Sequence, residues 1–267
     1  MKKKILIVGK KSLLSVSIKK HLQYEHDVRR VSISKIAQNK KFALKFDWII
    51  NCTFDAALNI KKSADFLIAN SIKKNKIFFV MISSSKVYGT SDTIPIGENK
   101  KCLPKNKYGK KKLAIEKKIN KLLNKKALIL RASNIIQFDI RKNLKIKTFI
   151  NTMLTDLKNR NKINIPSRKF KKDFLPINLF NQALSNLIRE NITGTYNIGS
   201  GIGIDVEKFA EFLIKGFGSG CINKTKNITD NMIFDIKKIK NKILYHISKK
   251  SIKKEIINLG KELKYSE

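Results

Sequence analysis

The stretch KKILIVG, residues 3–9, has the form of a buried parallel strand, because a short apolar run ends in glycine. Residues 12–22 follow with Leu and Ile at helical spacing. Further apolar runs and helical segments alternate through the first half of the chain. This alternation predicts an α/β fold whose parallel sheet has both faces covered and whose connections are right-handed.

The chain divides into two regions. The expected strands are 3–9, 27–34, 46–54, 76–85, 126–133 and 194–201, and the expected helices are 12–22, 57–73, 107–123, about 145–160, 178–191, 205–217 and 249–264. Residues 162–177 are expected to be irregular and extended, and Asn178 and Asp205 are candidate helix caps. Because the pattern loosens after about residue 140, we expect a sheet domain and a smaller C-terminal lobe with a cleft between them.

The composition is that of a globular protein with an unusual charge. Apolar residues make up 42% of the 267 residues, and no stretch approaches the roughly 20 apolar residues of a membrane span. The widely spaced Cys52, Cys102 and Cys221 form neither a metal pattern nor a disulfide framework, so we expect a reducing cytoplasm and no metal.

The net charge of +38 makes nucleic-acid binding an obvious hypothesis. The basic residues run along the whole chain, however, and Lys, Asn and Ile, which A/T-rich codons encode, are all abundant. This distribution favours compositional drift over a nucleic-acid interface, and a nucleic-acid partner is not expected.

The turn after the first strand resembles a degenerate phosphate-binding loop. A dinucleotide fold places glycines there so that backbone N–H groups and a helix N-terminus can approach a pyrophosphate. Gly9 is present, but Ser12 and Ser15 stand at the next two glycine positions, where a hydroxyl could donate to a phosphate. An ordinary strand-to-helix turn explains this stretch about as well.

The end of the second strand bears on the choice of cofactor. An acidic residue there would bind the adenosine ribose of NAD, but Ser32 stands near this position and Lys35 is close by. A small polar residue with a nearby lysine can accommodate a 2′-phosphate, which favours NADP and leaves NAD open.

Seven stretches occur in an order that matches one enzyme family. They are ILIVGKKSLLS (5–15), FDWIINCTF (46–54), VMISSSKVYG (80–89), PKNKYGKKKLAIE (104–116), LILRASNI (128–135), KKDFLPINLFNQAL (171–184) and GTYNIGSG (194–201). Together they resemble the extended short-chain dehydrogenase/reductase family of NAD(P)-dependent nucleotide-sugar epimerases, dehydratases and 4-keto reductases, over about residues 3–210. The resemblance implies a Rossmann-type doubly wound parallel sheet with a small C-terminal substrate lobe.

The resemblance also assigns a catalytic trio, Ser84, Tyr108 and Lys112. Hydride transfer at a sugar carbon requires a proton to move on the neighbouring oxygen, and tyrosine, with an ordinary pKa of about 10, needs a nearby ammonium to act at neutral pH. Residues at i and i+4 share a helix face, so Tyr108 and Lys112 should point the same way. Spacing to the VYG stretch selects Ser84 as the hydroxyl that polarises the carbonyl. A helix-start tyrosine beside a solvated lysine is the plain alternative.

The binding residues follow from the same resemblance. The expected cofactor-binding residues are Gly9, Ser12, Leu13, Leu14, Ser32, Cys52, Thr53, Phe54, Asn59, Ser83, Tyr108 and Lys112. The expected substrate-binding residues are Ser84, Ser85, Asn134 and Lys172, of which Asn134, in the loop after the fifth strand, and Lys172 are as readily plain loop residues.

The reaction expected is reduction of a nucleotide-diphosphate 4-keto-sugar in surface-polysaccharide precursor synthesis, with a 4-epimerase as the alternative. The family's dehydratases carry an Asp-Glu pair where this chain has Ser85 and Lys86, which argues against dehydration. A non-catalytic, basic nucleic-acid-binding relative is the alternative from another class. The resemblance further implies a dinucleotide-binding domain at 1–165, a substrate lobe at 166–267 with about 173–200 returning to the core, and a homodimer that uses the helix of Tyr108.

Overall fold

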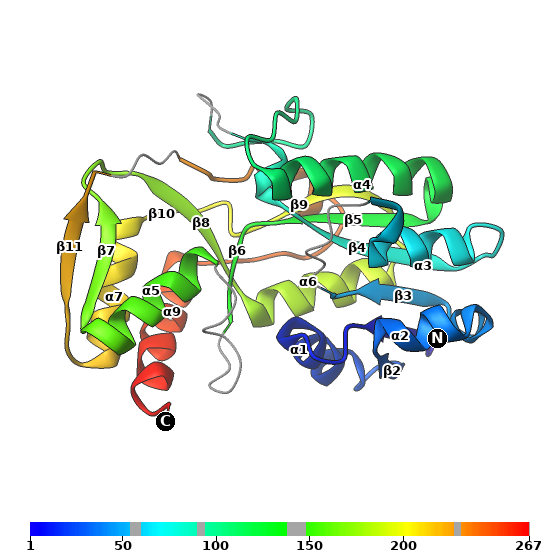
Figure 1. Cartoon of the computed structure of the whole chain (residues 1–267), viewed down its shortest axis with the longest axis horizontal. Helices are drawn as coiled ribbons and strands as arrows, with labels where there is room; N and C mark the ends of the chain where they lie inside the picture. The colour runs from blue at the N-terminus through cyan, green and yellow to red at the C-terminus, as the bar shows by residue number, and fades with distance from the viewer. Residues whose placement is uncertain (54–59, 90–93, 138–147, 227–230, 267) are drawn as a thin grey trace.

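The computed structural model describes residues 1–53, 60–89, 94–137, 148–226 and 231–266. Its centre is a six-stranded sheet of order β2-β1-β3-β4-β5-β9, in which every neighbouring pair is parallel (Figure 1). The strands are β1 (Lys4–Val8), β2 (Asp27–Val31), β3 (Trp48–Asn51), β4 (Phe78–Ser84), β5 (Ala127–Ala132) and β9 (Gly194–Ile198). Because β2 and β3 lie on opposite sides of β1, the strand order reverses at β1 and the sheet is doubly wound, as predicted.

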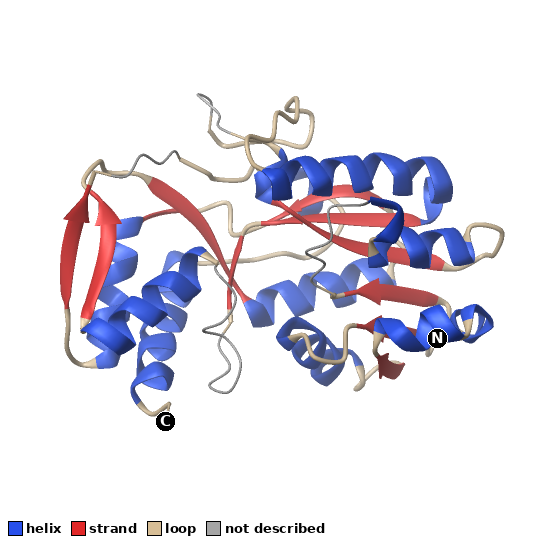
Figure 2. Cartoon of the chain, in the orientation of Figure 1, coloured by secondary structure: helices blue, strands red, loops and turns tan. Residues whose placement is uncertain are grey.

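Helices cover both faces of this sheet (Figure 2). They are α1 (Leu13–Leu22), α2 (Ile33–Gln38), α3 (Ala64–Ile72), α4 (Lys107–Leu123) and α6 (Ile177–Arg189). Successive side chains of β1 point to opposite faces: Ile5 and Ile7 share a core with residues of α1 and α6, whereas Leu6 and Val8 share one with residues of α2, α3 and α4. The central strands are therefore apolar on both sides.

A second group of elements surrounds a separate hydrophobic core. It contains β6 (Asn134–Ile136), α5 (Phe149–Arg160), β7 (Lys162–Pro166), β8 (Lys171–Pro176), β10 (Gly203–Asp205), α7 (Val206–Phe217), β11 (Cys221–Thr225) and α9 (Lys249–Lys264), while the short α8 (Lys237–Lys240) contacts β9. Helices α7 and α9 approach closely at Gly216. A Cβ at this residue would lie only 2.0 Å from the carbonyl oxygen of Ile257. We call this group the second core.

Several local predictions were wrong where non-local pairing decides the structure. Residues 162–177 are not irregular, since β7 pairs with β11 and β8 pairs with β6 and β10. Asn134 does not lie in a loop but begins β6. These short strands have partners far along the chain, which local sequence patterns do not identify.

One helix start and one strand end also differ from their predictions, and another helix start agrees. Helix α6 begins at Ile177 after Pro176, so Asn178 is not its cap. The second strand ends at Val31, and the two residues that follow Ser32 begin α2. The predicted cap at Asp205 is confirmed, because its side chain accepts a hydrogen bond from the Glu207 N–H at 2.9 Å.

The start of α4 lies against the end of β4 because of one glycine. Asn106 caps the helix by accepting a hydrogen bond from the Gly109 N–H at 2.7 Å. A Cβ at Gly109 would lie 2.2 Å from the carbonyl oxygen of Lys86, in the turn that follows β4. Only glycine permits this approach, which places the first turn of α4 beside the carboxyl end of the strand.

We therefore expect Gly109→Ala to destabilise the protein by about 1–3 kcal/mol, because the added methyl group forces the helix away from a backbone carbonyl. Urea unfolding followed by circular dichroism measures the change. Gly97→Ala is the matched control, since a Cβ there would meet only the Asp235 side chain, at 4.0 Å. Equal losses for the two variants would contradict this account of the close approach.

Candidate active site

Two neighbouring hollows open at the carboxyl ends of the central strands, where parallel α/β sheets bind ligands. The larger has a volume of about 690 Å³ and the smaller about 120 Å³. Thr53, which follows β3, lines both. The larger hollow lies over the start of α1, and the smaller is bounded by residues of α3, β4 and α4.

The turn between β1 and α1 requires its glycine. Gly9 has a φ of +121°, and a Cβ there would lie 3.0 Å from the carbonyl carbon of Cys52. Ser15 is fully buried, and its hydroxyl donates to the carbonyl oxygens of Gly9 and Ser12, each at 2.7 Å. Ser15 therefore closes the turn and does not face a ligand. Ser12 is the N-cap residue of α1 but makes no side-chain capping bond, and it lines the larger hollow.

The larger hollow collects six of the predicted cofactor-binding residues, which are Gly9, Ser12, Leu13, Leu14, Ser32 and Thr53. Lys10, Lys11 and Ile33 line the same side. The opposite side comes from the second core, through Ile135, Gln137, Thr148 and Asn151, which the sequence analysis did not identify. Among the residues described there, none is Asp or Glu.

The smaller hollow brings Tyr108 and Lys112 together. Both side chains come from α4, and Ser83 and Cys52 line the same space. Tyr108 is 39% exposed, so its ring is accessible from solvent. Cys52 is buried, and this burial raises the pKa of its thiol, which keeps it protonated.

The two neighbouring serines at the end of β4 have different partners. The Ser83 hydroxyl donates to the buried carboxylate of Glu116. The Ser84 hydroxyl is half-buried and accepts a hydrogen bond from the Lys86 N–H at 3.2 Å, which leaves its own proton available for donation. Ser83 lines the smaller hollow, whereas Ser84 is not among the described residues that line either one.

Lys112 is held by two acceptors. Its ammonium donates to the Ile82 carbonyl oxygen at 2.9 Å and to Asp65 at 3.4 Å. Burial opposes the charge, but the Asp65 carboxylate, with Tyr108 and Glu116, outweighs it and raises the pKa of Lys112. Lys112 is therefore an ammonium at neutral pH.

Asp65 and its neighbour Asn51 were not identified from the sequence. The Asn51 amide donates to the Asp65 carboxylate at 2.6 Å, and both residues line the smaller hollow. The available signal was an acidic residue on a hydrophobic face, because Asp65, Ile68 and Ile72 have helical spacing and all three are buried.

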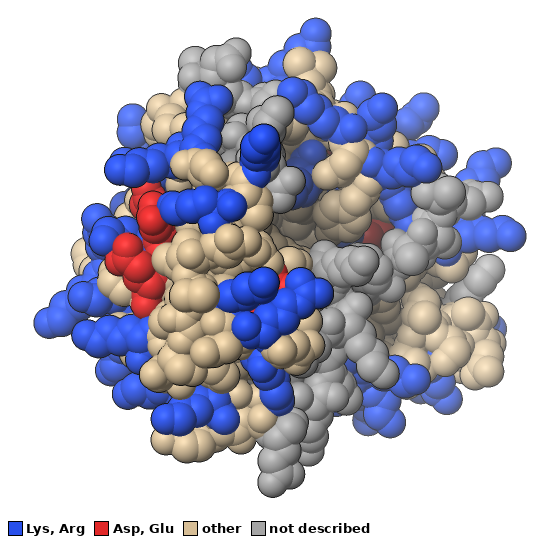
Figure 3. Space-filling model, turned by 60° about the vertical axis from the view of Figure 1, so that its left-hand side comes forward, with Lys and Arg blue, Asp and Glu red and all other residues tan. Residues whose placement is uncertain are grey.

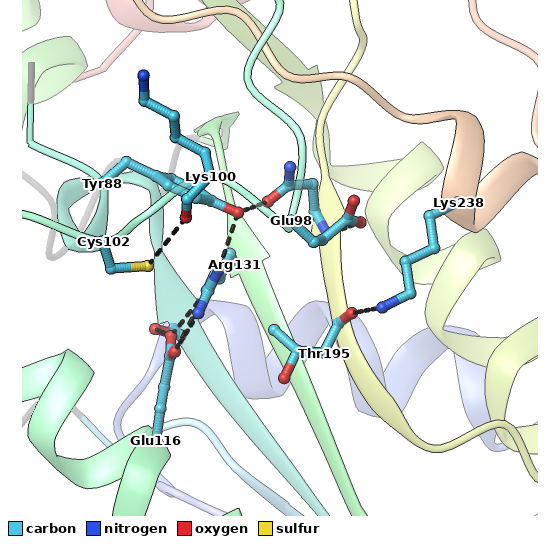
Figure 4. A network of polar contacts seen from close by, with 10 residues as sticks. Tyr88, Glu98, Lys100, Cys102, Glu116, Arg131, Thr195 and Lys238 are labelled. Atoms are coloured by element: carbon cyan, nitrogen blue, oxygen red, sulfur yellow. Dashed lines mark hydrogen bonds and ion pairs between the residues drawn. The ribbon is translucent and has the colours of Figure 1, made fainter. Parts of the chain in front are cut away.

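A second buried charge pair, Arg131 and Glu116, includes the acceptor of the Ser83 hydroxyl and connects four elements (Figure 4). The Arg131 guanidinium of β5 donates to Glu116 of α4 at 2.7 Å and to the Tyr88 hydroxyl at 2.9 Å. The Tyr88 hydroxyl in turn donates to Asn197 of β9 at 2.7 Å. Burial raises the pKa of Tyr88 to about 12, and the bonds to Glu116 raise that of Arg131 against its own burial. Removing one member would leave a buried partner unsatisfied, so this network fixes α4 on the sheet.

The remaining predicted site residues either do not line the two hollows or are not among the described residues. The Asn134 amide donates to the Asp173 carbonyl oxygen at 2.9 Å, and Lys172 is buried in β8 with its ammonium 5.5 Å from the Phe170 ring centroid. Ser85 is buried in the turn after β4. Phe54 and Asn59 fall outside the described residues.

Solved structures of nucleotide-sugar enzymes share this fold at low sequence identity. A UDP-N-acetylglucosamine 4-epimerase from Methanobrevibacter ruminantium is 16% identical, covers 98% of both chains and has a TM-score of 0.82. A dTDP-glucose 4,6-dehydratase from Bacillus anthracis, in complex with NAD, is 15% identical over 97% of both chains with a TM-score of 0.80. A dTDP-4-dehydrorhamnose reductase from the same organism, in complex with NADP, is 18% identical, covers 98% of this chain and 100% of its own, and has a TM-score of 0.77.

These three relatives catalyse different reactions, so their likeness shows the fold and leaves the reaction open. No curated protein matches the chain in sequence. Within the described residues, none of the helices has the length and apolar character that a membrane span needs. The family model described as the RmlD substrate binding domain matches residues 3–216, which is most of the 267-residue chain. The chain therefore belongs to that family, and its resemblance to the extended short-chain dehydrogenases/reductases is confirmed.

Proposed function

We propose that the protein is an NAD(P)-dependent reductase of a nucleotide-diphosphate 4-keto-sugar, acting in the synthesis of surface-polysaccharide precursors. The observation that carries the proposal is the placement of Tyr108 and Lys112 on one face of α4, in a hollow adjoining the one over the glycine turn. Hydride transfer to a ketone requires a proton donor and a bound dinucleotide. The phenol and the ammonium could supply the first, and the turn between β1 and α1 could hold the second, at the same edge of the sheet.

The first turn supports a dinucleotide. Gly9 carries no side chain, which lets the turn pack against the backbone that follows β3, and the Ser12 hydroxyl stands at the N-terminus of α1, the kind of position where proteins bind phosphate. Lys10 and Lys11 add positive charge to the same hollow. Since its described lining has no carboxylate to accept bonds from the adenosine ribose, and Ser32 leaves room for a 2′-phosphate, NADP is the favoured cofactor and NAD remains the alternative.

When bound, the nicotinamide supplies a hydride to C4 of the sugar. The Tyr108 phenol then gives its proton to the oxygen of the reduced carbonyl, and the Lys112 ammonium stabilises the phenolate that is left. The Ser84 hydroxyl, which accepts from the Lys86 N–H, donates its own proton to the same oxygen. Ser83 is already committed to Glu116, so the donor role falls to Ser84.

Dehydration has less support than reduction. The two positions after Ser84, where the family's dehydratases carry Asp and Glu, hold Ser85 and Lys86. A 4-epimerase, which would use the same trio in both directions, is the second candidate. The nucleotide-sugar partner is proposed to approach from the second core, where Asn134 and Lys172 lie, although neither lines the two hollows. The domain division at residue 165 and the homodimer stay predictions.

Nucleic-acid binding has less support than catalysis. On the face shown in Figure 3, Lys and Arg side chains are scattered over most of the surface and do not gather in one stripe. A backbone-tracking site would concentrate them along a groove with interleaved aromatics. The net charge of +38 is therefore better described as a general attraction for anionic ligands, which salt would weaken.

We expect NADPH to raise the melting temperature more than NADH, because the described lining of the larger hollow has no carboxylate and leaves room for a 2′-phosphate. A ligand present at a concentration of 100 times its Kd stabilises the folded state by about 2.7 kcal/mol. Ser32→Asp should reverse this preference, since a carboxylate would accept bonds from the ribose and repel a 2′-phosphate. Ser219→Asp makes the same change at an exposed residue between α7 and β11 and should alter neither change in melting temperature. Protection by neither cofactor would contradict the proposed function.

The reaction itself is tested with Tyr108→Phe. A panel of nucleotide-diphosphate 4-keto-sugars is offered with NADPH, and oxidation is followed by absorbance. We expect Tyr108→Phe to lose about 10²–10⁴-fold in kcat while NADPH still protects against thermal unfolding. Tyr24→Phe, at a tyrosine that is 80% exposed, is the control and should keep full activity. Unchanged turnover in Tyr108→Phe would remove the phenol from the mechanism.

A further inference from the structure

Asp65 is a buried carboxylate that the proposed reaction does not use. It lies in the first turn of α3 and is 4% exposed. One oxygen accepts from the Asn51 amide at 2.6 Å, and the other from the Lys112 ammonium at 3.4 Å. Asn51 is itself fixed, because its side-chain oxygen accepts from the Thr53 N–H at 3.1 Å and from the Thr53 hydroxyl at 2.8 Å. The carboxylate is thus held from β3 and directed at Lys112.

The charges around Lys112 single out this carboxylate. The groups that face its ammonium are Asp65 from α3, Tyr108 and Glu116 from α4, and the thiol of Cys52 after β3. Glu116 is already paired with Arg131 at 2.7 Å, and the Cys52 thiol is kept protonated by burial. Asp65 is therefore the carboxylate of this hollow that pairs with the Lys112 ammonium.

We propose that Asp65 is a positioning residue for the reaction: it holds the Lys112 ammonium against the Ile82 carbonyl and partly offsets its charge, so that Tyr108 keeps its proton to a higher pH. The inference rests on the proposed function, because it concerns the proton that Tyr108 donates. An unopposed ammonium would draw the proton from the phenol at lower pH, and Lys112, buried without its carboxylate, would itself lose a proton more easily. Both effects have the same sign.

The test is the pH dependence of kcat/KM for Asp65→Asn, with NADPH and whichever keto-sugar the wild type reduces. A reductase loses activity as the pH rises, once the phenol or the ammonium loses its proton. We expect this fall to begin about one pH unit lower in Asp65→Asn than in the wild type. Asp27→Asn removes the same charge from an exposed residue at the other end of the sheet and should leave the profile unchanged. A lower rate with an unmoved profile would overturn the proposal, because a merely structural role predicts that result.

A second measurement does not depend on turnover. At neutral pH, Asp65→Asn should lower the melting temperature of the wild type but not that of a Lys112→Met variant, where no buried ammonium is left unpaired and the substitution instead neutralises an unpaired buried carboxylate. If Asp65→Asn alone fails to fold, the double variant should recover a folded protein. A double variant as unstable as Asp65→Asn, or equally unfolded, would contradict the pairing.

The two measurements separate the inference from the proposed function. If the wild type reduces no keto-sugar, the proposed function fails, and the tuning role of Asp65 fails with it even where the stability cycle shows the pairing. If the wild type is active and the profile of Asp65→Asn is unmoved, the inference alone fails.

Discussion

The position of the Lys112 ammonium depends on how α4 packs against the central sheet and α3. It is held between the Ile82 carbonyl of β4 and the Asp65 carboxylate of α3, at 2.9 and 3.4 Å. That arrangement requires α4 to lie against the carboxyl end of β4, which in turn requires a residue without a side chain at Gly109. The Glu116–Arg131 pair then fixes the same helix two turns later. Tyr108, Lys112 and Glu116 thus occupy one face of α4, where Tyr108 and Lys112 line the smaller hollow and Glu116 pairs with Arg131.

The glycine turn and α4 are joined through the sheet. The ends of β1 and β3 pair at Val8 and Asn51, and a Cβ at Gly9 would lie 3.0 Å from the carbonyl carbon of Cys52. Thr53 continues from this contact and lines both hollows. A ligand that spanned the two hollows would therefore touch the glycine turn at one end and the Tyr108 phenol at the other. Ser15, which stands where the dinucleotide-binding pattern has a glycine, fits this geometry because its hydroxyl donates to carbonyl oxygens within the turn.

Sequence patterns were sufficient for the sheet and for the helix of Tyr108, because apolar runs and i,i+4 spacing are local signals. Six of the expected cofactor-binding residues line the larger hollow, and their binding of a cofactor stays a prediction. They did not find β6 or β8, whose partners are distant in the chain, or Asn151 and Gln137, which reach the hollow only through the packing of the second core. Asp65 was missed for another reason: a lone acid on an apolar helix face is identifiable, but its partner Lys112 lies on a different helix, 47 residues away.

The most direct test of the account is a crystal structure of the complex with NADP⁺. The account predicts the pyrophosphate at Gly9 and Ser12, the adenosine ribose beside Ser32, and the nicotinamide ribose within hydrogen-bonding distance of the Lys112 ammonium. Density for the dinucleotide away from the glycine turn, or a nicotinamide ring that points away from Tyr108, would contradict the claim that one helix face unites the phenol, the ammonium and the cofactor.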